Sequence, residues 1–185
     1  GHRVVHGMKH TEPELVSSLL LDELYSILPY DPDHMPSEIH LIEAFIRHHP
    51  MLPQIACFDT AFHQDMPRVA KLLAIPRRFE EKGVQRYGFH GLSYSYLIEE
   101  LAKLDETNPN AGRIILAHLG NGASMAAVHN GKSIDTSMGF TPASGLPMST
   151  RSGDVDPGLV TYLMRMEHMT EAQFHEMTNR ESGLL

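Results

Sequence analysis

The stretch over residues 118–157, HLGNGASMAAVHNGKSIDTSMGFTPASGLPMSTRSGDVDP, is the most informative part of this sequence. An apolar strand over residues 113–120 runs into a Gly-Asn-Gly turn, and a second apolar segment follows. Asn130-Gly131 then fits a two-residue hairpin turn. Because glycine has no Cβ, backbone N–H groups in such a turn can approach a bound anion closely. Arg151 follows in a polar loop, so the first hypothesis is a phosphate-binding site.

The regions on either side alternate between expected helices and strands. We expect a short buried strand at residues 54–58 and a polar loop at residues 105–112. Thr11 and Thr170 are candidate N-caps of the first and last helices. Strands interleaved with helices imply an α/β fold. The predicted helices cover residues 12–28, 38–49, 92–104, 157–166 and 171–177.

The composition bounds the class of protein. The 185 residues carry a net charge of −8, which argues against nucleic acid as the main partner. No apolar run reaches the ~18 residues of a transmembrane helix, and no signal peptide is evident, so we expect no membrane partner. The single cysteine, Cys57, excludes an internal disulfide and fits a cytoplasmic location. The 13 histidines show no zinc-binding spacing, and no protein metal site is expected.

Six segments resemble signature segments of the acetate kinase family, in the same order along nearly the whole chain. They are GHRVVHG (1–7), CFDTAFH (57–63), RYGFHG (86–91), HLGNGAS (118–124), DTSMGFTP (135–142) and TRSGDVDPG (150–158). The resemblance implies an actin-like ATPase (ribonuclease H-like) architecture. It also implies reversible transfer of the ATP γ-phosphoryl group to acetate, giving acetyl phosphate and ADP, with Mg²⁺.

The resemblance also implies how the chain is organised. Family chains are longer: they begin with a phosphate loop and carry a late adenosine-binding segment, which this sequence lacks. We therefore expect an internal fragment that is a poor catalyst alone. Residues 1–60 would end an N-terminal acyl-binding domain, and residues 61–185 would begin a C-terminal nucleotide-binding domain. The full-length protein is expected to be a homodimer.

Five polar residues match active-site positions of the family, four of them catalytic and one, Arg3, substrate-binding. Arg3 would hold the acceptor carboxylate, and Arg151 the transferring group, because guanidinium forks suit carboxylate and phosphate oxygens. His90 would donate to the phosphoryl group with His118 beside it, and Asp59 would act on Mg²⁺ or near the acyl acceptor. The structural alternatives are a surface arginine, a hydrogen-bonded core histidine for His118 and an Asx cap for Asp59. Asp154 and Asp156 fit an N-cap region at least as well as a site.

Two further groups come from the same resemblance. The phosphate loop would comprise His118, Leu119, Gly120, Asn121 and Gly122. Val5, Phe89 and Pro142 match an apolar pocket for the acyl methyl group, although such residues are usually core.

The chain departs from the family pattern at several places. Leu92-Ser93-Tyr94 stands where the family usually has Thr-Ser-His, and residues 35–41 lack a run that forms part of the acyl pocket. The preferred acid is therefore open, and propionate or butyrate kinase is the nearest competing hypothesis. Two hypotheses from different classes are a non-catalytic anion-binding module and a remnant without a stable fold.

Overall fold

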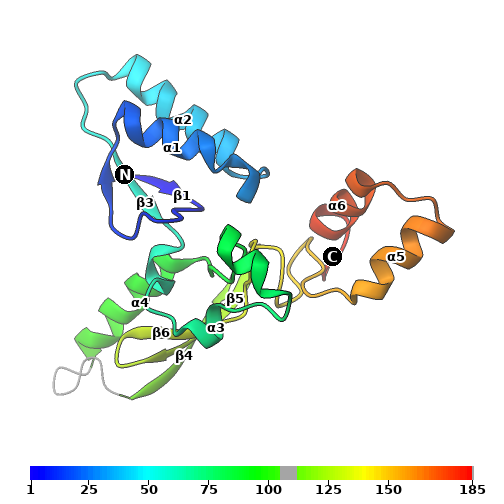
Figure 1. The fold of residues 1–185 in the computed structure, drawn as a ribbon. Helices are drawn as coiled ribbons and strands as arrows, with labels where there is room; N and C mark the ends of the chain where they lie inside the picture. Colours follow the sequence, from blue (N-terminus) through cyan, green and yellow to red (C-terminus); the bar gives the residue numbers. More distant parts are fainter. Residues whose placement is uncertain (105–111, 185) are drawn as a thin grey trace.

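The computed structural model describes residues 1–104 and 112–184, which form two three-stranded sheets with helices packed against them (Figure 1). The first sheet contains β1 (His2–Val4), β2 (Glu14–Leu15) and β3 (Ile55–Phe58). The second contains β4 (Arg113–Leu119), β5 (Ala123–His129) and β6 (Lys132–Thr136). Strands and helices alternate, which confirms the α/β class. The loop expected at residues 105–112 lies outside the described residues except for Gly112.

The first sheet brings the start of the chain against β3. Its order is β1-β3-β2, and β1 runs parallel to β3 with Arg3 opposite Cys57. The crossover between them carries α1 (Ser18–Ser26), the short helix η1 (Leu28–Tyr30) and α2 (Met35–His48). Both long helices bury apolar residues in the core at helical spacing. Because β1 and β3 are parallel, the residues after both strands lie at the same edge of the sheet.

Two helix starts differ from the sequence prediction. The helix predicted over residues 12–28 begins only at Ser18, because Glu14–Leu15 pairs antiparallel with β3 instead. The Ser17 side chain caps it by accepting from the Leu20 N–H at 3.1 Å, so Thr11 is not the N-cap. The helix predicted over residues 38–49 begins earlier, at Met35, since proline is tolerated in a first helical turn.

The second sheet is an antiparallel meander in the order β4-β5-β6. Residues 120–122 join β4 to β5. Asn130 and Gly131 join β5 to β6 with φ of 51° and 76°, which confirms the predicted hairpin turn. Helix α4 (Gly91–Leu104) covers one face of the sheet with Tyr94, which packs in a cluster with Leu116, Ala126 and Val128. This packing places the start of α4 beside the β4–β5 turn.

The last part of the chain is a pair of helices, α5 (Pro157–Met166) and α6 (Glu171–Arg180), at one side of the molecule (Figure 1). Asp156 caps α5 by accepting from the Gly158 N–H, and Thr170 caps α6 through a capping box, as predicted. Helix α6 ends at Arg180 rather than at residue 177 because its hydrogen bonds continue for another turn. Three short helical turns, η2 (Ala61–His63), α3 (Arg68–Lys71) and η3 (Arg77–Lys82), lie between β3 and α4.

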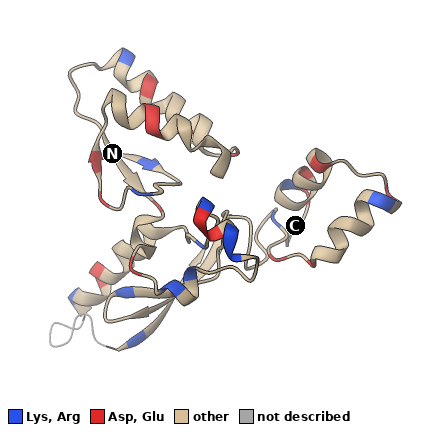
Figure 2. Cartoon of the chain, viewed as in Figure 1, with Lys and Arg blue, Asp and Glu red and all other residues tan. Residues whose placement is uncertain are grey.

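Charged residues are absent from two long stretches of the chain, residues 114–131 and 136–150. Figure 2 shows acidic and basic residues on the helices, whereas strand β5 of the second sheet carries neither. Among the described residues, no helix has both the length and the apolar character needed to cross a membrane.

Candidate functional site

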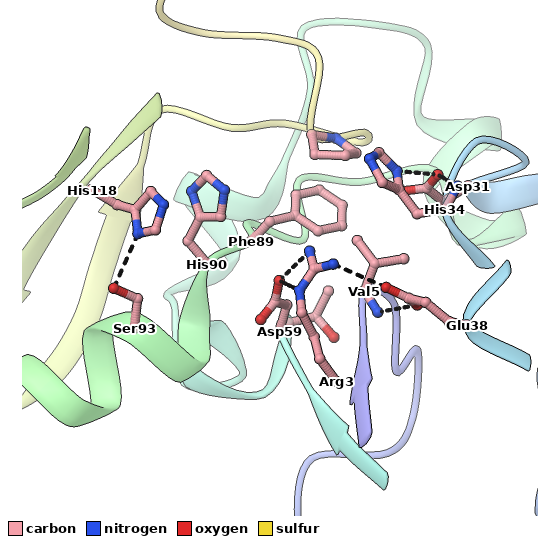
Figure 3. A network of polar contacts seen from close by, with 12 residues as sticks. Arg3, Val5, Asp31, His34, Glu38, Asp59, Phe89, His90, Ser93 and His118 are labelled. Carbon is pink, nitrogen blue, oxygen red and sulfur yellow. Dashed lines mark hydrogen bonds and ion pairs between the residues drawn. The ribbon is translucent and has the colours of Figure 1, made fainter. Parts of the chain in front are cut away.

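The ends of β1 and β3 carry an ion-pair cluster centred on Arg3 (Figure 3). The Arg3 Nε and Nη2 atoms lie 2.8 and 2.7 Å from Asp59 Oδ2, and Nη1 donates to Glu38 Oε1 at 2.9 Å. The second oxygen of Glu38 accepts from the backbone N–H of Val5 at 2.8 Å. Three of the five guanidinium N–H donors are thus used by two carboxylates. The other two remain for an added anion, since Arg3 keeps 46% of its side chain exposed.

The ion-pair cluster holds the Arg3 side chain in place but contributes no net positive charge to the site. Burial lowers the Arg3 pKa, but the charges of Asp59 and Glu38 outweigh burial, and the pKa is raised overall. Burial raises the Glu38 pKa, although the Val5 N–H and Arg3 oppose it. The hydrogen bonds to Asp59 and Glu38 orient the Arg3 side chain. Because the two carboxylates offset the charge of one guanidinium, another cation must attract an anion to the site.

His90 is brought to this edge by an unusually close approach of two segments. The Gly91 N–H donates to the Asp59 carbonyl at 2.9 Å, and a Cβ on Gly91 would stand 2.2 Å from that oxygen. Only glycine therefore fits between β3 and the start of α4. His90 itself has φ of 60°, a conformation that non-glycine residues rarely adopt and that is enriched at functional sites.

The two predicted histidines lie against each other. The rings of His90 and His118 stack with centroids 4.0 Å apart and an interplanar angle of 23°. His90 Nδ1 lies 2.8 Å from the Ser124 hydroxyl, and His118 Nδ1 lies 3.0 Å from the Ser93 hydroxyl. Burial lowers the His90 pKa to about 3, and the neighbouring His118, Arg3 and Arg151 act in the same direction. His90 is therefore a neutral imidazole at pH 7.

The β4–β5 turn lies where His90 and Arg151 converge. A Cβ built on Gly122 would stand 3.1 Å from His90 Nε2 and 3.3 Å from Arg151 Nη1. Arg151 donates to the Pro142 carbonyl at 3.0 Å, and within residues 1–104 and 112–184 it forms no ion pair. Burial lowers the Arg151 pKa, although Asp31 and Asp33 oppose this. Arg151 thus supplies the uncompensated positive charge that Arg3 lacks.

The rest of the expected phosphate loop lies on the same turn. Gly120 donates to the Gly122 carbonyl at 3.0 Å, and the Ser149 N–H donates to the Asn121 carbonyl at 3.2 Å. The Leu119 side chain is largely exposed at the end of β4. The Asn121 contact joins the turn to the segment that carries Arg151.

The three residues expected to form an acyl pocket are all buried. Val5 and Phe89 are fully buried in the main core cluster, and Pro142 is also buried. A cavity of about 320 Å³ lies beside Pro142 and Arg151, between the loop that carries Asp31 and Asp33 and helix α6. Among the predicted site residues, only Pro142 and Arg151 line this cavity.

Sequence reasoning missed several members of the site. Glu38 lies in α2, far along the chain from Arg3, and no local motif marks it. Ser93 and Tyr94 follow His90 within one helical turn, so their spacing in the predicted helix could have indicated them.

Comparison with known proteins shows what this chain is similar to. A family model described as the Acetokinase family matches residues 1–185. The chain belongs to the acetokinase family. It is 48% identical over 185 residues to an acetate kinase of Methylocella silvestris. The matched region covers 100% of this chain and 46% of that relative. The chain thus spans about half the length of the curated relatives that it matches.

Solved structures of acetokinase-type enzymes superpose closely on the chain. A propionate kinase from Francisella tularensis gives a TM-score of 0.93 at 40% identity, covering 99% of this chain and 48% of that one. The acetate kinase of Porphyromonas gingivalis gives 0.88 at 41% identity, covering 98% and 46%. These matches confirm the expected actin-like ATPase fold class for this acetokinase chain.

The described residues build no metal centre of their own. No group of three or more His, Cys, Asp or Glu side chains in residues 1–104 and 112–184 could hold a metal ion. Asp59 has a carboxylate of the kind that Mg²⁺ prefers, but its Oδ2 is occupied by Arg3. A Mg²⁺ ion held by the phosphate oxygens of a nucleotide would not need such a group of protein ligands.

Proposed function

We propose that the protein carrying this chain transfers a phosphoryl group reversibly between ATP and acetate, forming acetyl phosphate and ADP. The observation that carries the proposal is the convergence of His90 Nε2 and Arg151 Nη1 over the bare Cα of Gly122. Two nitrogen donors over a glycine turn suit the phosphoryl oxygens, which need closely placed hydrogen-bond donors and no Cβ in the way. Membership of the acetokinase family supports the same reaction.

The reaction requires charge stabilisation rather than proton removal. An acetate oxygen forms a bond to the γ-phosphorus, and the bond to the bridging oxygen of ADP breaks. Negative charge spreads over the equatorial oxygens in this transition state. The acetate carboxylate has no proton to lose, so His90 and Arg151 act as donors. Arg3, held by Asp59 and Glu38, offers its two remaining N–H groups to the carboxylate. Bound Mg²⁺ would add charge neutralisation on the nucleotide phosphates.

The remaining assignments rest on the family resemblance. We propose His118 beside the transferred group and residues 119–122 as the phosphate loop. Val5, Phe89 and Pro142 would contact the acyl methyl group. The division into residues 1–60 and 61–185, with the site between them, is part of the same proposal, as are a homodimer and a cytoplasmic location.

The test is trapping of acyl phosphate with hydroxylamine in the protein encoded by the complete reading frame. The reaction contains acetate, ATP and Mg²⁺. Arg151→Ala is expected to lower kcat by at least about 10²-fold, as for loss of one preorganised transition-state donor. Arg165→Ala, on exposed α5, is the matched control and should leave kcat unchanged. Equal activity of both variants would remove Arg151 from the mechanism. Inorganic phosphate binding without turnover would favour an anion-binding module.

A second candidate acid is propionate, because the chain superposes on the Francisella tularensis propionate kinase with a TM-score of 0.93. Measuring kcat/KM for acetate, propionate and butyrate in the same assay separates the candidates. We expect acetate to give the highest value. A higher value for propionate would move the assignment to propionate kinase without changing the roles of Arg151 and His90.

A further inference from the structure

A buried chain of hydroxyl groups leads from α4 to His90. The Tyr94 hydroxyl lies 2.5 Å from Ser124 Oγ, and Ser124 Oγ lies 2.8 Å from His90 Nδ1. Tyr94 and Ser124 are both 0% exposed. Ser124 belongs to β5, directly after the turn, so the hydroxyl chain connects α4, the second sheet and the functional site.

The donor and the acceptor of each hydrogen bond between these hydroxyl groups and His90 can be assigned by counting protons. Ser124 Oγ is the acceptor that the described residues offer to the Tyr94 hydroxyl, and a buried O–H without an acceptor is costly. Tyr94 therefore donates to Ser124. The buried serine O–H also needs an acceptor, and among the described residues its other partner is His90 Nδ1. Ser124 must then donate to Nδ1, which cannot carry a proton itself.

The state of the two titratable groups agrees with this direction. Burial raises the Tyr94 pKa despite contacts with Ser124 and the His118 backbone, so the phenol keeps its proton at neutral pH. Burial lowers the His90 pKa to about 3, so the ring holds a single proton. With Nδ1 accepting, that proton lies on Nε2, the atom that faces Gly122.

We propose that Tyr94 and Ser124 are positioning residues that hold His90 in its Nε2–H tautomer. In the opposite tautomer, an Nε2 lone pair would face the position of the phosphoryl oxygens beside Arg151 and repel them. The tautomer assignment stands on the hydrogen bonds alone. Its catalytic consequence rests on the proposed phosphoryl transfer.

The tautomer can be measured without any assay of activity. In the protein from the complete reading frame, labelled with ¹⁵N-histidine, long-range ¹H–¹⁵N correlation spectra at pH 7 distinguish a protonated Nε2 from a protonated Nδ1. The loss of one ring signal set in His90→Gln assigns His90. We expect the Nε2–H form in the wild-type protein. A dominant Nδ1–H form would overturn the proposal.

Three variants test the hydroxyl chain itself. Tyr94→Phe and Ser124→Ala should each populate the Nδ1–H form and lower kcat for acetate by roughly tenfold or more, by analogy with other outer positioning partners. Tyr96→Phe is the matched control, because Tyr96 lies two residues after Tyr94 and is exposed. It should change neither the His90 tautomer nor kcat. His90 spectra unchanged in both Tyr94→Phe and Ser124→Ala would overturn the proposal. If Tyr94→Phe does not fold, Ser124→Ala and the wild-type spectrum decide. An inactive wild-type protein with the Nε2–H form would refute only the proposed function.

Discussion

At the scale of single residues, Gly122 is the position where space matters most. A methyl group there would stand 3.1 Å from His90 Nε2 and 3.3 Å from Arg151 Nη1. The Gly122 backbone lies outside the left-handed region, so alanine is compatible with its conformation. The glycine is therefore explained by the space it leaves between two donors rather than by a turn requirement.

We predict that Gly122→Ala lowers kcat/KM for ATP and acetate by about 10²-fold, because the methyl group occupies the expected phosphoryl position. The midpoint of thermal unfolding should change by only a few degrees. Steady-state kinetics and a thermal melt check both parts. Full activity in a folded Gly122→Ala protein would show that the phosphoryl group lies elsewhere.

The sequence allowed part of the site to be anticipated at this scale. Arg3, Asp59, His90 and Arg151 are predicted site residues because each stands inside a short signature segment, and their roles stay predictions. Their partner Glu38 was missed because its contact with Arg3 spans 35 residues and depends on how α2 packs against β1.

At the scale of elements, the start of α1 is set by one side chain. The Ser17 hydroxyl accepts from the Leu20 N–H, whereas Thr11 lies six residues before this cap. We predict that Ser17→Ala lowers the free energy of unfolding by about 1 kcal/mol. Thr11→Ala, the matched control, should change it by less than about 0.5 kcal/mol. Urea unfolding measures the free energy of unfolding of both variants. A larger loss for Thr11→Ala than for Ser17→Ala would support the longer helix predicted from the sequence.

Elements with local signals were predictable, and those set by distant pairing were not. The Asn130-Gly131 hairpin and the caps at Asp156 and Thr170 depend on residues within a few positions of each other. Strand β2 instead exists because Glu14–Leu15 pairs with β3, some forty residues later. A helical spacing of leucines cannot reveal that pairing.

At the scale of the whole molecule, buried neutral histidines link stability to pH. Burial lowers the pKa of His63 to about 4, although a hydrogen bond to the Phe89 carbonyl opposes it. Burial also lowers the pKa of His6 to about 4. Between pH 6.5 and 4 the unfolded chain binds protons that the folded chain does not. Stability is therefore complete above pH 6.5 and falls as the pH drops toward 4, by up to about 3 kcal/mol for each histidine.

We predict that His63→Gln reduces this acid sensitivity, because glutamine can still donate to the Phe89 carbonyl but does not titrate. The wild-type free energy of unfolding should fall between pH 7 and pH 5 by about 2 kcal/mol more than that of the variant. Urea unfolding at both pH values measures the difference. Equal losses in the two proteins would show that His63 is protonated in the folded state.

The fold class was predictable at this scale because six segments of one family occur in order. The arrangement of Arg151 and His90 over Gly122 was not, since it depends on the loop from residue 137 to 150 folding back onto the β4–β5 turn. The domain division near residue 60 stays a prediction.

The most direct test of the central claim is ATP formation from acetyl phosphate, ADP and Mg²⁺ by the protein from the complete reading frame. The account predicts Mg²⁺-dependent ATP formation that falls at least about 10²-fold in Arg151→Ala and is retained in Arg165→Ala. Absence of ATP formation by a folded wild-type protein that still binds acetyl phosphate would contradict the proposed phosphoryl transfer.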